Sequence, residues 1–155
     1  MKLFVDCDSC PSQVREIIIK AAERTKSPSF FVANHKIPHS INAYTYDIIV
    51  EEGKDKADDY IVDHATERDI AVTRDILLAQ RLVERKVAVV NDRGTQYTAE
   101  NIRERVSIRN YMLELAQNGL KTEEVSSFGK KELYQFANAF DTLVTRKLKE
   151  EKDES

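Results

Sequence analysis

The feature that most constrains the fold is a regular alternation between short apolar runs and helical stripes. Five runs rich in β-branched and aromatic residues lie at positions 2–6, 29–33, 47–50, 69–73 and 87–91. They are nearly continuous in apolar residues, which is typical of strands that are covered on both faces. Apolar residues at helical spacing separate most of these runs, at 14–21, 58–65 and 76–83. This order predicts an α/β domain with a doubly wound, mostly parallel sheet of five strands.

The remaining pattern fits one domain. Two longer helices are expected over about 98–118 and 130–149, and the segment 34–46, which has no helical stripe, is expected to be a loop. A chain of 155 residues, 41% of them hydrophobic, is long enough for a single core. We expect the domain to span 1–148 and the charged end, 149–155, to be frayed.

Composition excludes several classes of protein. The formal net charge of -3 argues against nucleic-acid binding through bulk positive charge. Unbroken apolar runs such as 30–33 and 87–90 are four residues long, whereas a membrane-spanning helix needs about 18 or more. Only three apolar residues follow Met1–Lys2, which does not fit a signal peptide, and two cysteines make no disulfide framework. The sequence therefore predicts a cytoplasmic protein without a membrane partner.

Acidic residues follow several of the predicted strands. Asp6 ends the first strand, with Asp8 in the turn beyond it. Asp58 and Asp59 lie in the first turn of the helix after the third strand, and Asp75 lies just past the fourth strand. Ligands of open α/β sheets bind beyond the carboxyl ends of the strands, where these crossovers would bring the acids together. Close carboxylates repel one another unless a cation lies between them, and an all-oxygen acidic site suits Mg²⁺ or Mn²⁺.

Each acid also has a structural alternative. A lone aspartate at the end of a strand is more often a helix N-cap or a first-turn acid than a ligand. Asp6 fits this alternative least well, because it is too far ahead of Pro11, a plausible first helical residue, to cap that helix. The prediction of a site rests on the coincidence of several acids at one edge.

Motifs along nearly the whole chain resemble the bacterial YaiI/YqxD family. They are VDCDSCP at 5–11, FVAN at 31–34, KADDYIVDHA at 56–65, AVTRDILLA at 71–79, VVNDRGTQYT at 89–98, ENIRERVSIRNYM at 100–112 and FANAFDTLV at 136–144. That family looks like a branch of the PIN-like, or NYN-like, nuclease superfamily. Members of this superfamily are three-layer sandwiches that arrange acids around one or two divalent metals and cut phosphodiesters.

The resemblance implies a role for each acid. Asp6, Asp58 and Asp75 would be the catalytic, metal-binding acids. Asp8 and Asp59 would bind metal beside them, directly or through water, and the hydroxyl of Thr73 would support them. The substrate implied is nucleic acid, with RNA preferred over DNA.

A nuclease also needs phosphate contacts. Arg93 follows the fifth strand and should approach the same edge, whereas Arg105 and Arg109 lie one turn apart on a predicted helix. Arginine suits bidentate contact with phosphate, although a solvated helix face is the plainer interpretation of the helical pair. Asn34 and Asn91 also end strands and would position water or phosphate, but asparagine more often forms turns.

The cysteines allow two further interpretations. Cys7 and Cys10 form a C-x-x-C motif between a strand and a helix, as in thioredoxin-like redox pairs. The strand order argues against that fold, and Asp8 opposes thiolate formation. A zinc site with His35 and His39 would need a finger about twice the usual length.

The predicted function is therefore a divalent-metal-dependent nuclease that uses metal-activated water. A non-catalytic module of the same fold that binds metal or nucleic acid is the main alternative, and a redox protein is a weaker one. The sequence gives no oligomeric state.

Overall fold

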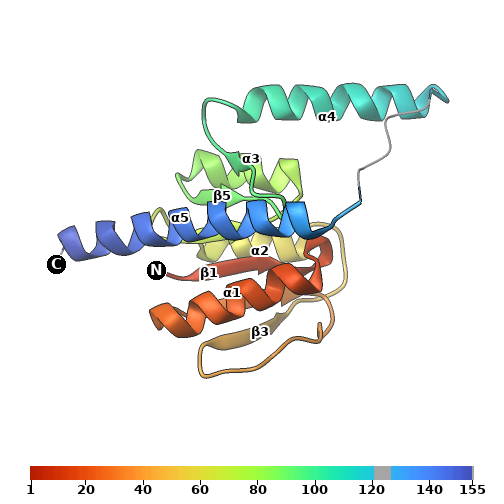
Figure 1. Cartoon of the computed structure of the whole chain (residues 1–155). Helices are drawn as coiled ribbons and strands as arrows, with labels where there is room; N and C mark the ends of the chain where they lie inside the picture. Colours follow the sequence, from red (N-terminus) through yellow and green to blue (C-terminus); the bar gives the residue numbers. More distant parts are fainter. Residues whose placement is uncertain (121–126, 155) are drawn as a thin grey trace.

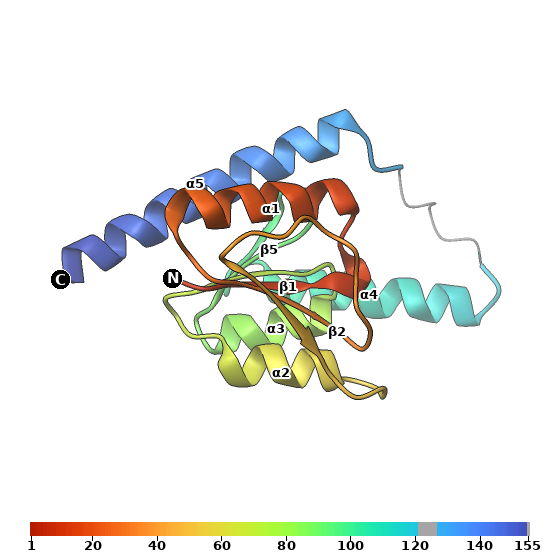
Figure 2. The ribbon, with the colours of Figure 1, turned by 90° about the horizontal axis from the view of Figure 1, so that it is seen from below.

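The computed structural model describes residues 1–120 and 127–154, which form three layers around a six-stranded sheet. The strands are Leu3–Asp6 (β1), Ser29–Ala33 (β2), Thr45–Ile49 (β3), Ile70–Val72 (β4), Ala88–Val90 (β5) and Gln96–Tyr97 (β6). The helices are Ser12–Thr25 (α1), Lys56–His64 (α2), Ile76–Glu84 (α3), Ile102–Gln117 (α4) and Lys130–Glu154 (α5), with a 3₁₀ turn, η1, at Cys7–Ser9. Helices α1 and α5 cover one face of the sheet, and α2 and α3 cover the other (Figures 1 and 2).

The strands lie in the order β3-β2-β1-β4-β5-β6, which puts β1 in the middle of the sheet. All neighbouring pairs are parallel except β5 and β6, which are antiparallel. The predicted α/β fold with a mostly parallel sheet is confirmed. Because parallel strands point the same way, the residues that follow β1, β4 and β5 all reach one edge, which we call the carboxyl edge.

Two cores hold the layers together, and alternate residues of each strand contribute to them. Leu3 and Val5 of β1 pack under α1 and α5, together with Phe136 and Phe140 of α5. Phe4, between them in the sequence, packs on the opposite face in the core that contains the buried residues of α2 and α3. This alternation follows from the period of two in a strand, and it explains why the strand sequences are apolar throughout.

Two sequence expectations about the elements were wrong. The sheet has a sixth strand, because a turn at residues 91–95 folds Gln96 back beside Val90. The charged end does not fray after residue 148, because α5 continues to Glu154. Long-range contacts stabilise its last turns. The Met1 amino group pairs with Glu151, and Arg68 Nη2 lies 2.9 Å from Glu154 Oε2.

Among the described residues, no helix has the length and apolar character needed to cross a membrane.

Candidate active site at the carboxyl edge

Asp6 is a buried acid at the carboxyl edge. It is the last residue of the central strand β1 and is only 5% exposed. The hydroxyl of Thr73, just past β4, donates a hydrogen bond of 2.8 Å to Asp6 Oδ2. Ser9 Oγ, in the turn after β1, lies 3.3 Å from the same oxygen. Two hydroxyls from different segments therefore fix the orientation of this carboxylate.

Asp75 is positioned by the helix that it begins. It is the N-cap of α3, and its Oδ1 accepts hydrogen bonds from the backbone N–H groups of Leu77 (2.9 Å) and Leu78 (3.2 Å). Its own N–H donates to Thr73 Oγ1 at 3.0 Å. Asp75 thus satisfies the structural alternative and still lies beside Asp6, because the capping bonds use only one of its carboxylate oxygens.

Asp58 brings a third carboxylate to the same place. It lies half-buried in the first turn of α2. Burial, followed by the negative charges of Asp75 and Asp6, raises the pKa of Asp58 to about 6. Burial also raises the pKa of Asp6, and the charges of Asp8 and Asp75 add to that effect. The structure therefore places Asp6, Asp58 and Asp75, from three separate crossovers, close enough for their charges to act on one another.

The other two predicted acids lie further out. Asp8 is exposed in η1, and its charge acts on Asp6. Asp59 is also exposed, and its Oδ1 lies 3.0 Å from Arg81 Nη2 of α3. The Asp59 carboxylate therefore has an ion-pair partner at the surface.

The donor set fits a hard divalent cation. In the described part of the chain, no three His, Cys, Asp or Glu side chains lie close enough to hold one metal ion among them. The edge nevertheless presents oxygen ligands only, and the carboxylates repel one another as they stand. Mg²⁺ suits such a site because it keeps several waters and needs only one or two carboxylates in direct contact. Asp6, Asp58 and Asp75 are the residues that would hold it.

The predicted phosphate contacts are scattered. Asn91 forms the turn after β5, since its Oδ1 accepts 2.9 Å hydrogen bonds from the N–H groups of Arg93 and Thr95. Asn34 is exposed after β2 and contacts His35. Arg105 and Arg109 lie on α4, which packs against α3.

Arg93 packs against α5 and the segment before it. Its guanidinium lies 5.8 Å from the centre of the Phe128 ring. Its Nη1 lies 3.7 Å from Glu132 Oε1. Arg93 lies in the turn that follows β5. A contact between Arg93 and phosphate at the carboxyl edge stays a prediction.

Two charged residues at the edge were missed by the sequence analysis. Arg74 lies between Thr73 and Asp75, and its Nε and Nη2 both bond to the carboxylate of Asp92. The Asp92 side chain is only 2% exposed, whereas that of Arg74 is 48% exposed. Asp92 lies two residues past β5, so the rule that identified the other acids also applies to it.

The cysteines are poor candidates for redox or zinc chemistry. Cys7 and Cys10 are free and buried. Burial is the main cause that raises the pKa of Cys7 to about 12, and it raises the pKa of Cys10 further. Thiols in this state resist forming the thiolate that both chemistries require. His39 bonds to Asp47 and stacks on Phe31.

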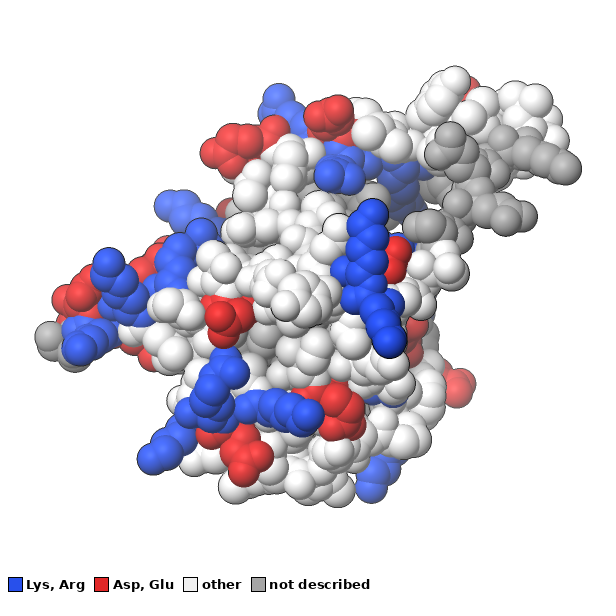
Figure 3. Space-filling view, viewed as in Figure 1, with Lys and Arg blue, Asp and Glu red and all other residues white. Residues whose placement is uncertain are grey.

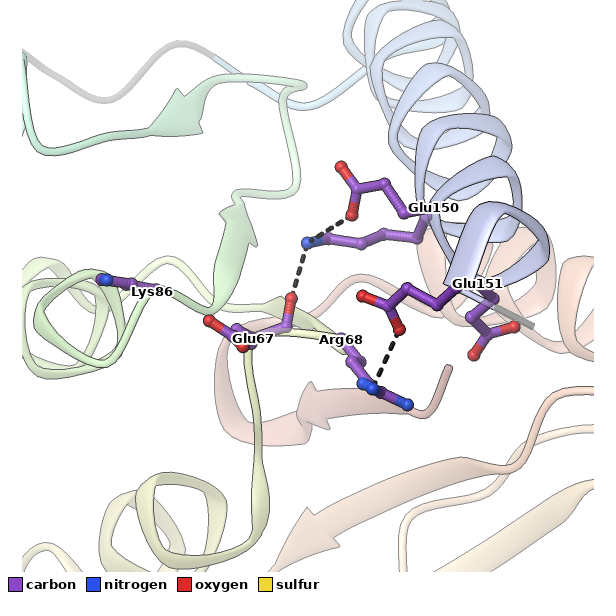
Figure 4. A pocket seen from close by; sticks show the side chains of 7 residues that line it. Glu67, Arg68, Lys86, Glu150 and Glu151 are labelled. Atoms are coloured by element: carbon purple, nitrogen blue, oxygen red, sulfur yellow. Dashed lines mark hydrogen bonds and ion pairs between the residues drawn. The ribbon is translucent and has the colours of Figure 1, made fainter.

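A cavity of about 320 Å³ lies at the opposite, amino edge of the sheet. Its lining is charged with both signs: Glu67, Arg68, Lys86, Lys147, Glu150, Glu151 and Glu154. In Figure 4 these side chains bridge α5 and the turn before β4, where Lys147 Nζ donates to the carbonyl of Glu67 at 2.7 Å. The lining side chains therefore form contacts that hold α5 against the turn before β4. None of them is a residue of the carboxyl edge.

Comparison with known proteins identifies relatives along the whole chain. Residues 4–146 match the family model described as "Uncharacterized BCR, YaiI/YqxD family". A UPF0178 protein of Treponema denticola is 46% identical over 150 residues, which cover 97% of this chain and 96% of the relative. A UPF0178 protein of Myxococcus xanthus is 42% identical over 151 residues, which cover 97% and 99%. No solved structure matches the chain significantly.

Proposed function

The chain belongs to the YaiI/YqxD family, and from its carboxyl edge we propose that it is a divalent-metal-dependent nuclease that hydrolyses phosphodiester bonds in single-stranded RNA. One observation carries the proposal. Asp6, Asp58 and Asp75 come from three crossovers, and the negative charge of Asp75 helps to raise the pKa of both Asp6 and Asp58. Repulsion between these carboxylates destabilises the folded chain, and a bound cation would relieve it.

The chemistry of the site matches phosphodiester hydrolysis. A bound Mg²⁺ or Mn²⁺ supplies a water of lowered pKa and stabilises the charge that develops on the phosphate. Asp6 would hold the cation, and the hydroxyl of Thr73 keeps the Asp6 carboxylate in one orientation. Asp75 is held by α3, so its position does not depend on the ligand. The resemblance of the YaiI/YqxD family to PIN-like nucleases favours the same choice of reaction.

The test is a cleavage assay with a labelled 20-nucleotide RNA and the matching DNA, in Mn²⁺, in Mg²⁺ and in EDTA. We expect cleavage of RNA with either metal and none in EDTA. Asp6→Asn and Asp75→Asn should each reduce the rate at least 100-fold, because each removes a charged metal ligand. Asp141→Asn, on the exposed face of α5, is the matched control and should cleave like the wild type.

Two results would count against the proposal. Cleavage that persists in EDTA or in both edge variants would show that it does not arise at this edge. Stabilisation by metal without any turnover would instead identify a non-catalytic binding module of the same fold.

A further inference from the structure

The carboxyl edge has two sides with different charge. Asp6 follows Phe4 by two residues and faces α2 and α3, as Phe4 does. Arg74 and Asp92 follow Val72 and Val90 by two residues, and both valines pack under α1 and α5. We call the region of Asp6, Asp58 and Asp75 the acidic side. The opposite side, beneath α1 and α5, carries Arg74 and two further arginines.

The Arg74–Asp92 pair is built to hold a guanidinium at the surface. Asp92 is buried and accepts bonds from Arg74 Nε and Nη2 on its two oxygens. These bonds use two of the five N–H donors of the guanidinium, and nearly half of the Arg74 side chain is exposed. Burying a carboxylate for such a pair adds little to stability on average. The pair does fix the orientation of the Arg74 guanidinium, and Arg74 lies between Thr73 and Asp75 in the sequence.

Arg15 and Arg93 lie on the same side as Arg74. Arg15, on α1, donates through Nη1 to the carbonyl of Cys10 at 2.5 Å. Arg93 packs over Phe128 and pairs with Glu132 of α5. We call these three residues the arginine side. With Asp92 and Glu132 included, its formal charge is +1, because three arginines face two acids. Asp6, Asp58 and Asp75 together carry -3 when ionised, so the charge changes sign across the edge.

On the face formed by α1 and α5, Lys and Arg side chains are interspersed with Asp and Glu (Figure 3). A polyanion would therefore not be drawn to this face by a broad field, so its binding depends on fixed individual cations.

We propose that the arginine side binds a phosphate group of the nucleic-acid strand next to the phosphate that is cleaved, with Arg74 as the main contact and Asp92 as its positioning residue. The proposal deepens the proposed function and rests on it. The strand would cross the edge of the sheet, with the scissile phosphate on the acidic side and its neighbour on the arginine side. The substrate class that follows is an oligonucleotide with at least one further phosphate, and not a phosphomonoester.

Binding is the readout that tests this proposal apart from catalysis. A fluorescein-labelled 10-nucleotide RNA is titrated with protein in Ca²⁺, and the anisotropy is measured at several salt concentrations. Arg74→Gln should weaken binding about tenfold, as expected for one charged hydrogen-bonding contact. It should also reduce the slope of log K against log salt by about 0.7, the value for one phosphate contact on a single strand. Arg24→Gln, which breaks an exposed ion pair on α1, should change neither quantity.

A series of RNAs, each with one phosphate replaced by a neutral methylphosphonate, locates the contact. One replacement should weaken binding to the wild type about tenfold and leave binding to Arg74→Gln unchanged. Asp92→Asn should give the same pattern more weakly, because the guanidinium remains but is no longer held. A wild-type slope in Arg74→Gln, or an equal loss for both proteins at every replaced phosphate, would overturn the proposal. Failure of the proposed function looks different, since RNA would then bind with these signatures and not be cut.

Discussion

At the scale of single residues, Asp58 shows the cost of assembling the acidic side. Its pKa is raised from 3.8 to about 6, chiefly by burial and then by Asp75 and Asp6. A carboxyl group whose pKa is higher in the folded than in the unfolded state favours folding at low pH, and this contribution is lost as pH rises through 6. In EDTA, Asp58→Asn should therefore stabilise the protein at pH 7.5 and not at pH 4. After allowance for solvent screening, we expect about 1 kcal/mol, or an increase in Tm of about 2–4 °C.

Thermal denaturation by circular dichroism at the two pH values measures this difference. Addition of Mn²⁺ at pH 7.5 is the control, because the cation should stabilise the wild type more than the variant and so narrow the gap. An equal gain at pH 4 and pH 7.5 would show that Asp58 is not under electrostatic stress.

The acids could be found from the sequence, but their partners could not. Asp6, Asp58 and Asp75 follow from a rule about strand ends, which depends only on strand order. Asp92 fits the same rule, because it lies two residues past β5, whereas its ion pair with Arg74, 18 residues away, has no local signature. Asn91 ends a strand as predicted, yet its amide serves the turn to Thr95. A side chain's position can follow from the pattern, whereas its use is decided by tertiary neighbours.

At the scale of elements, Asp75 combines two roles that substitution can separate. Asp75→Ala removes both the cap of α3 and the negative charge, whereas Asp75→Asn keeps a side chain that caps about as well. We expect Asp75→Ala to lower stability by about 1 kcal/mol. Asp75→Asn should be at least as stable as the wild type in EDTA, because repulsion with Asp58 and Asp6 is relieved. Urea denaturation measures both, and an equal loss in the two variants would mean that capping is not the stabilising contact.

Gly94 determines how closely the β5–β6 turn approaches α5. Its φ is +86°, and an added Cβ would lie 2.5 Å from the backbone oxygen of Gln135. Gly119 also has a positive φ, +74°, but among the described residues no atom lies within 4 Å of the added Cβ. Gly94→Ala should thus cost about 3 kcal/mol from backbone strain and overpacking together, and Gly119→Ala about 1 kcal/mol from strain alone. Urea midpoints compare them, and similar losses would show that α5 can move away from the turn.

The elements themselves were largely predictable, with two informative failures. The strand at 29–33 was placed to the residue, because four consecutive apolar residues follow Ser29 between a proline and an asparagine. Strand β6 has only two residues, so its sequence cannot show the alternation of apolar and polar residues that predicts a strand. The last turns of α5 are charged and lack an apolar stripe, so their helical state depends on partners at Met1 and Arg68. Distant contacts of this kind are invisible to a local pattern.

At the scale of the whole molecule, a bound cation would act as a link between distant segments. Asp6, Asp58 and Asp75 belong to β1, α2 and α3, so an ion held by them adds its binding energy to the folding of three elements at once. At a free Mn²⁺ concentration about 100 times its Kd, the gain is about 2.7 kcal/mol. For a chain of this size that is an increase in Tm of about 5–10 °C.

The increase in Tm on addition of Mn²⁺ should depend strongly on Asp6. Asp6→Asn should abolish the Mn²⁺-dependent increase, whereas Asp141→Asn, on exposed α5, should keep it. Differential scanning fluorimetry across a Mn²⁺ titration, at constant ionic strength set with NaCl, measures the dependence without any substrate. Because simple screening of the acids would respond equally to NaCl, an increase that NaCl reproduces would count against a bound ion. An increase that Asp6→Asn retains would place the ion elsewhere, and the acidic side would then have no metal to explain its repulsion.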